Sequence, residues 1–290
     1  MKIYCFAPSG YEGTLVEVEV DIRRGIPGLE IVGLPDSAVR ESRDRVRVAI
    51  RNSGFSFPSD RVLVNLAPAD VRKEGSGFDL PIAIALLHAS RQFPPCSLQE
   101  LLVVGELQLS GSIRGVRGIL PAVAAGLEQD ISRFLVPLDN ANEAGALERG
   151  EVWSAVSLIE AVNIVWGSRD SSRHETSHAA ITAGTSGSEL AIPAGGDLSD
   201  LQGHKALKRA LAIAAAGRHH LLLFGPPGAG KTMAARRLPG ILPSLSRENS
   251  VAVTRIHSLA GALPQGSGLI KIPPFRMPHH SASAEGLIGG

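Results

Sequence analysis

Residues 221–232, LLLFGPPGAGKT, join a short apolar run to a glycine-rich loop that ends in lysine and threonine. The last eight residues match the spacing G-x-x-x-x-G-K-[ST]. Glycines at these positions let backbone N–H groups approach phosphate oxygens closely, Lys231 can reach the terminal phosphates, and the Thr232 hydroxyl can ligate Mg²⁺. We therefore expect ATP and Mg²⁺ to bind here. The predicted phosphate-binding residues are Gly225, Pro226, Pro227, Gly228, Ala229, Gly230, Lys231 and Thr232.

The elements that must position this loop are visible on both sides of it. The apolar run 221–224 predicts a strand that is buried on both faces, and a helix is expected from the loop to Leu238, where Pro239 ends it. Another helix is predicted within residues 198–220, with Gly217 as its stop. The apolar face of that helix comprises Ala206, Leu207, Ala210, Leu211 and Ala214.

A phosphate loop binds a nucleotide but does not hydrolyse it unaided. ATPases also need an acidic group at the end of another strand and usually an arginine finger. After Thr232 the only acidic residues are Glu248 and Glu285, and neither follows an apolar strand. The sequence therefore predicts nucleotide binding without residues for turnover, in a chain that stops before the nucleotide-binding domain is complete.

Composition sets the broad class of the protein. The chain has 290 residues, which is room for two ordinary domains, and a formal net charge of +1, which neither favours nor excludes a polyanionic partner. Cys5 and Cys96 are the only cysteines, so no disulfide framework is expected. Without an apolar leader or an apolar run long enough to span a membrane, we expect a soluble cytoplasmic protein.

Hydrophobic periodicity predicts a mixed α/β domain over residues 1–166. Within residues 15–22, Val16, Val18, Val20 and Ile22 alternate with acidic residues, which is typical of a half-buried strand. Helices are expected at 37–54, with Ser37 as N-cap and Gly54 at its end, and at 79–90. The other expected strands are 28–34, 61–66, 101–109, 133–137 and 151–156.

Residues 167–196 lack periodicity and are rich in Ser, Gly, Thr and Ala, so they are expected to form a flexible linker before a second domain at 197–290. The linker contains His174 and His178 at helical spacing. A metal site would need a third ligand and a helix, so we interpret this pair as solvated linker residues.

Four motifs now point to a family. The chain contains GLPDSAVRESRDRVRVAIRNSGF, NLAPADVRKEGSGFDLPIAIALL, GPPGAGKT and PFRMPHH in this order. This set resembles the magnesium-chelatase-like AAA+ family of bacterial ComM/YifB proteins. The resemblance implies a Lon-protease-like (ribosomal S5-like) mixed α/β domain followed by a P-loop AAA+ domain, an ATP-dependent homo-oligomeric ring, and a DNA helicase role in branch migration during natural transformation. The family pattern continues beyond Gly290 with the acidic strand, the sensors and the arginine finger.

The Lon resemblance also implies a lost protease. Beside the Lon pattern K-D-G-P-S-A-G, residues 73–79 read KEGSGFD, which places Gly77 at the nucleophile position and Ser76 one step early. The position of the catalytic lysine falls on Leu120. A serine without a local base is not activated, so we expect no catalytic residues in this half.

Basic residues crowd the helix expected at 37–54. Those that recur at helical spacing, and could form a cationic stripe for DNA phosphates, are Arg40, Arg43, Arg47 and Arg51. The alternative is a solvated face with internal ion pairs, for which Glu41 and Arg45 are available. His279 and His280 are adjacent and point apart in an extended chain, and His219 and His220 are expected at a strand edge.

Three functions remain open. The first is an incomplete ATPase piece of a DNA-remodelling helicase with branched or single-stranded DNA as partner. The second is a chelatase-type motor that serves Mg²⁺ insertion into a porphyrin, although the Lon-like half is foreign to that enzyme's ATPase subunit. The third is a non-hydrolysing nucleotide-binding assembly module.

Overall fold

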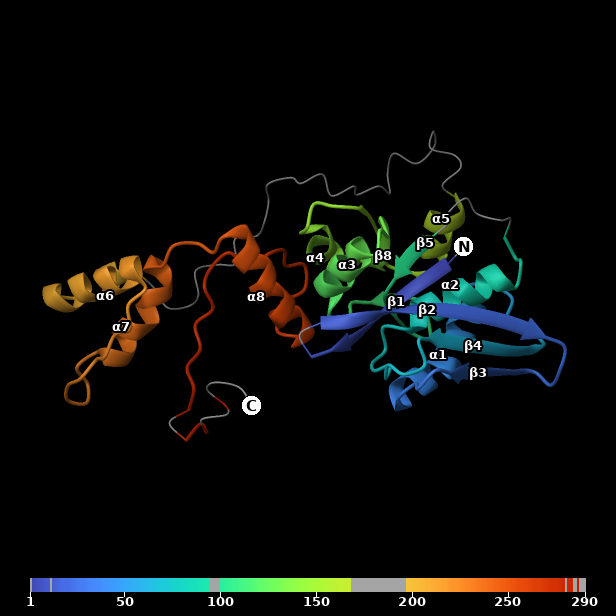
Figure 1. The fold of residues 1–290 in the computed structure, drawn as a ribbon, viewed down its shortest axis with the longest axis horizontal. Coiled ribbons are helices and arrows are strands. Elements are labelled where there is room, and N and C mark those ends of the chain that lie inside the picture. The colour runs from blue at the N-terminus through green and yellow to red at the C-terminus, as the bar shows by residue number, and fades with distance from the viewer. Residues whose placement is uncertain are drawn as a thin grey trace. The chain divides into compact units, whose positions relative to one another are not determined.

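The computed structural model describes residues 2–10, 12–93, 100–167, 197–279, 281–283 and 286, and the chain divides into two compact units (Figure 1). The first unit contains the N-terminal part of the chain together with Val251–Leu269. The second contains the remaining described residues from Asp197 onward. The linker beyond Gly167, Cys96, His174, His178, His280 and Glu285 lie outside the described residues.

A seven-stranded mixed sheet forms the centre of the first unit, in the order β3-β4-β2-β1-β5-β8-β9. β2 pairs antiparallel with both β1 and β4, and the other neighbours are parallel. This arrangement confirms the mixed α/β class. The strands are β1 (Lys2–Ser9), β2 (Glu12–Arg23), β3 (Gly28–Val32), β4 (Arg61–Ala67), β5 (Glu100–Val103), β8 (Arg133–Pro137) and β9 (Glu151–Ala155), and a separate ribbon pairs β6 (Glu106–Leu107) with β7 (Ile113–Arg114).

Two apolar clusters use alternate residues of the strands, as the pleat of a sheet requires. In β1, Ile3 and Cys5 belong to one cluster, whereas Tyr4 and Phe6 belong to the other. The first cluster includes α1 (Ser37–Asn52), α2 (Asp79–Ala89) and α5 (Leu158–Gly167). The second includes α3 (Ile119–Glu128) and α4 (Ala141–Gly145).

Most of the elements expected in this unit are present. In β2, Val16 and Val18 are buried while Glu19 and Asp21 are exposed, which confirms the predicted alternation. The prediction of Ser37 as N-cap of α1 is wrong, because the carboxylate of Asp36 accepts the hydrogen bond from the Val39 amide at 2.7 Å.

The strand expected at 101–109 is interrupted. β5 ends at Val103 and β6 begins at Glu106. Between them Gly105 leaves the sheet, because its N–H donates to the Gly77 carbonyl and its carbonyl accepts from the Leu80 N–H. The start of α2 therefore takes over backbone groups that a continuous strand would have paired.

The second unit is small and helical in its described part. Its regular elements are a 3₁₀ turn at Leu198–Asp200, α6 (Lys205–Gly217), α7 (Lys231–Arg237), a 3₁₀ turn at Leu238–Ile241 that contains Pro239, and the first turn of α8 (Arg247–Leu259). Leu201, Leu211 and Ala234 form its core. Among the described residues of the chain, no helix has the length and apolar character that crossing a membrane requires.

The prediction of a buried strand at 221–224 is wrong for this chain. These residues adopt no strand, and Leu222 and Phe224 are 91% and 99% exposed. A strand needs neighbouring strands to pair its backbone and cover its faces. None of the described residues of the second unit forms a strand that could do so.

Candidate nucleotide-binding site

The glycines of the loop at residues 225–232 allow its backbone to turn sharply. Gly228 and Gly230 have φ angles of 79° and 78°, a left-handed conformation that residues with a Cβ rarely adopt. The space where their Cβ atoms would lie is open, with nothing within 4 Å. Without side chains at Gly228 and Gly230, the loop backbone can therefore come close enough to a phosphate group to donate hydrogen bonds to it.

Lys231 begins α7 and turns its amine back onto the loop. Its Nζ donates hydrogen bonds to the carbonyl oxygens of Gly225 at 2.8 Å and Pro226 at 2.7 Å. Its ammonium group is therefore held over the loop in which phosphates are expected. Phosphate oxygens could replace the two carbonyl oxygens as its acceptors.

Thr232 lies in the first turn of α7 and is exposed. Its position, one residue after Lys231, fits the role of a Mg²⁺ ligand that the motif assigns to this hydroxyl. The loop glycines, Lys231 and Thr232 together offer the donors and the oxygen ligand that a magnesium nucleotide needs.

Packing of α7 sets the place of the loop within the second unit. Ala234 is fully buried among Leu201 and Leu211, and its N–H donates to the Gly230 carbonyl at 2.8 Å. The guanidinium of Arg237 lies 3.4 Å from the Asp200 carboxylate. A residue before α6 therefore ties down the far end of the helix that follows the loop.

The acidic residues after the loop do not add a strand-end acid to the described site. Glu248 is exposed in the first turn of α8 (Arg247–Leu259), which no periodicity argument had predicted. Glu285 lies outside the described residues.

Two family models match parts of the chain, and curated relatives align with nearly all of it. A family described as "Subunit ChlI of Mg-chelatase" matches residues 18–140, and one described as "Magnesium chelatase, subunit ChlI" matches residues 197–290. The chain is 40% identical over 288 residues to competence protein ComM of Haemophilus influenzae, covering 99% of this chain and 55% of that protein. It is 41% identical over 288 residues to YifB of Escherichia coli K12, covering 99% and 54%.

The chain belongs to the ComM/YifB family of magnesium-chelatase-like AAA+ proteins. A further relative, Rv2897c of Mycobacterium tuberculosis, is 44% identical over 289 residues, which is 100% of this chain and 56% of that protein. The chain thus spans about half the length of the curated relatives that it matches.

The Lon resemblance aligned Gly77 and Leu120 with the positions of a catalytic dyad, and the structure shows where these residues lie. Gly77 immediately precedes the turn into α2, and Leu120 is fully buried in α3. The neighbouring Ser76 hydroxyl donates to the Glu106 carboxylate. The fully buried Lys73 donates to the Pro68 carbonyl, and burial lowers the pKa of its amine.

We predict that serine-directed covalent probes leave the chain unlabelled, because the partner of Ser76 is a carboxylate and Leu120 has no amine to activate a serine. The measurement is intact-mass analysis after incubation with a fluorophosphonate. Labelling that is present in the wild type and lost in Ser76→Ala would show that this site retains a nucleophile.

The structure also shows a buried polar cluster that pattern reasoning missed. The Asp79 carboxylate is fully buried and accepts from the Ser42 hydroxyl, from the Arg45 guanidinium at 2.9 and 3.1 Å, and from the Leu107 N–H at 3.2 Å. Burial raises the pKa of Asp79, against the lowering effect of Arg45 and Ser42. The hydrogen bond to Asp79 raises the pKa of Arg45. The sequence feature that could have revealed this cluster is Asp79 itself, an acidic residue at the first position of a helix whose next eight residues are apolar.

The arginines of α1 divide into different environments. Arg40, Arg43 and Arg51 are exposed. Arg47 is partly buried, with its guanidinium 5.0 Å from the centre of the Phe57 ring. Of the predicted stripe, three side chains are therefore available to solvent and one is partly committed to an aromatic contact.

The histidines fit no shared site. His219 and His220 are exposed and do not lie at a strand edge as expected, because residues 219–224 form no strand. The ring of His279 is exposed and lies 2.7 Å from the Ser281 hydroxyl. Among the described residues, no group of three or more His, Cys, Asp or Glu side chains could hold a metal ion.

Proposed function

We propose that the chain binds MgATP through residues 225–232 and represents the nucleotide-binding part of a DNA-remodelling ATPase. The observation that carries this proposal is the phosphate loop itself, with two glycines in left-handed conformations and the Lys231 amine held over the loop. Backbone N–H groups and a lysine are sufficient for phosphate affinity.

Turnover is a separate matter. We expect residues 1–290 to bind ATP without hydrolysing it, because the described residues place no acid at the end of a strand beside the loop. Calorimetry of MgATP binding together with a phosphate-release assay tests both halves of the proposal. Steady phosphate release that needs Lys231 would contradict the second half and direct attention to Glu248.

The DNA partner is supported by family membership, by the name of one relative, a competence protein, and by the exposed arginines of α1. Branched and single-stranded DNA are both candidate substrates, and assembly into a homo-oligomeric ring belongs to the same proposal. A chelatase-type motor would instead show porphyrin-linked turnover. A non-hydrolysing assembly module would bind nucleotide without binding DNA.

We predict that Arg40→Ala combined with Arg43→Ala, which removes two exposed arginines of α1, weakens DNA binding across all sequences and lowers the slope of log K against log salt by up to about two units. The physical reason is that each lost phosphate contact releases one counterion fewer. The measurement is fluorescence anisotropy of labelled duplex and branched DNA at several salt concentrations.

The matched control for this prediction removes the same charge elsewhere in the unit. Arg23 and Arg61 are exposed and paired with Asp21 and Glu30. Their double alanine variant should keep the wild-type slope. Equal slopes for all three proteins would leave the α1 arginines as a solvated face.

A further inference from the structure

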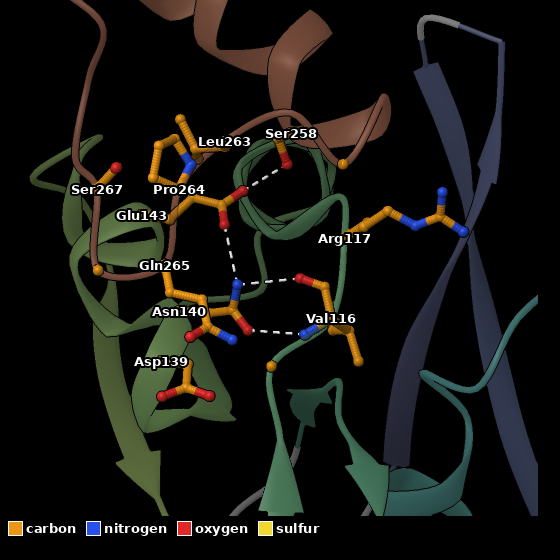
Figure 2. Close-up of a pocket in the computed structure, with 13 residues that line it drawn as sticks. Val116, Arg117, Asp139, Asn140, Glu143, Ser258, Leu263, Pro264, Gln265 and Ser267 are labelled. Atoms are coloured by element: carbon orange, nitrogen blue, oxygen red, sulfur yellow. Dashed lines mark hydrogen bonds between the residues drawn. The ribbon is translucent and has the colours of Figure 1, made fainter.

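The segment Val251–Leu269 follows the phosphate loop in sequence but packs within the first unit. Its central contact is Ser258, which is 2% exposed. The Ser258 hydroxyl donates to the Glu143 carboxylate and accepts from the Gly118 N–H at 3.0 Å. Both hydrogen-bonding roles of the hydroxyl are therefore used, one against the start of α3 and one against α4. Figure 2 shows the bond to Glu143.

Glu143 connects this contact to the body of the unit. Its carboxylate is 4% exposed and also accepts from the Leu120 N–H at 2.9 Å and from the Asn140 amide at 3.0 Å. Asn140 in turn exchanges two hydrogen bonds with the backbone of Val116, at 2.9 and 3.0 Å (Figure 2). A buried carboxylate with this many donors is costly to disturb, so the network is a specific attachment.

A second contact holds the loop that follows α8. The Gly266 N–H donates to the Asp139 carbonyl at 3.1 Å, and the Asn142 amide donates to the Gly266 carbonyl at 2.8 Å. Leu259 adds an apolar contact to the cluster around α3. Between the two sets of hydrogen bonds lies a cavity of about 200 Å³. It is lined by residues from 115–143 and by residues from 258–267.

The part of the first unit that contacts residues 251–269 includes the position that the Lon resemblance aligns with a catalytic lysine. Leu120, which the Lon resemblance aligns with the dyad lysine, now contributes its N–H to Glu143. Gly118 contributes its N–H to Ser258. The end of α3 that would carry a base in a protease therefore binds a segment of the same chain.

We propose that the first unit is a receptor for residues 251–269 and that docking of this segment is coupled to nucleotide binding at residues 225–232. The coupling rests on the proposed nucleotide site. The chain passes from the second unit into the first at Val251, inside α8, only 19 residues after Thr232. A nucleotide that orders the loop and its following helix changes the free energy of docking, and by linkage docking changes nucleotide affinity by the same factor.

The test uses the whole chain and hydrogen exchange at the amides of Gly118 and Leu120, whose acceptors are Ser258 and Glu143. Saturating MgATP should change exchange at these two amides by about 5-fold or more, and Ser258→Ala should change the Kd for MgATP by a similar factor. Asn142→Ala removes only the exposed bond to Gly266, and it should shift the Kd in the same direction if Ser258→Ala does not fold.

Ser42→Ala is the matched control. It also removes a fully buried serine that donates to a buried carboxylate in the first unit, but its partner is Asp79. It should leave the Kd unchanged. MgATP binding without any change at Gly118 and Leu120, and with wild-type Kd in the Ser258 and Asn142 variants, would overturn the coupling alone. Absence of MgATP binding to the wild type would overturn both this inference and the proposed function.

Discussion

Replacing Lys231 by alanine is expected to lower the affinity of the chain for MgATP by about 10- to 100-fold, the effect of losing a hydrogen-bonded charge partner. The ammonium group is held by the Gly225 and Pro226 carbonyls, and binding exchanges these partners for phosphate oxygens. Alanine keeps the helix start but supplies neither charge nor donor. Isothermal calorimetry at fixed Mg²⁺ and salt measures the change.

Two controls separate loss of phosphate contact from loss of loop structure. Lys205→Ala removes an exposed lysine from α6 in the same unit and should bind MgATP as the wild type does. Lys231→Arg retains the charge but presents a planar fork in place of a compact ammonium group, so it should recover only part of the affinity. Wild-type affinity in Lys231→Ala would show that the nucleotide binds elsewhere or not at all.

The same variant distinguishes binding from turnover. We expect no phosphate release from either the wild type or Lys231→Ala. The loop depends on glycine conformations and one lysine, all of which local sequence encodes. Hydrolysis depends on groups brought from other strands, which local sequence around the loop does not supply.

Local signals predicted most strands of the first unit, but not β1 (Lys2–Ser9), for which no strand was expected. The alternation in β2 and the glycine spacing in residues 225–232 act over a few residues, so they can be read without knowing the tertiary structure. The N-cap shows the limit of this reasoning. Asp36 and Ser37 are both good capping residues, and only the backbone geometry at Asp36 decided between them.

The failures concern residues whose partners are distant in sequence. The apolar run at 221–224 has the composition of a buried strand, yet composition cannot provide the neighbouring strands that would bury it. The docking of Ser258 on Glu143 joins residues 115 positions apart. An acidic residue in α4 and a serine in α8 carry no pattern that links them, so the structure was needed to find this contact.

Replacing Asp79 by alanine is expected to destabilise the first unit by about 3–5 kcal/mol, the usual cost of removing one partner from a buried ion pair. The change removes the carboxylate that accepts from the Ser42 hydroxyl, the Arg45 guanidinium and the Leu107 N–H, and it leaves the Ala38 carbonyl as an acceptor for Arg45. It also removes the link between α1 and the start of α2. Both tryptophans, Trp153 and Trp166, lie in the first unit, so urea unfolding followed by their fluorescence reports on this unit.

Glu41 provides a control on the same arginine. Its carboxylate lies 3.8 Å from the Arg45 guanidinium, but its side chain is 74% exposed, so Glu41→Ala should cost less than about 1 kcal/mol. Arg45→Met combined with Asp79→Leu removes both charges and should recover much of the stability lost in Asp79→Ala, because an apolar pair leaves no buried charge without a partner. Equal losses in Asp79→Ala and Glu41→Ala would mean that burial adds nothing to the interaction with Arg45, and that the cluster around Asp79 is not what holds α1 against α2.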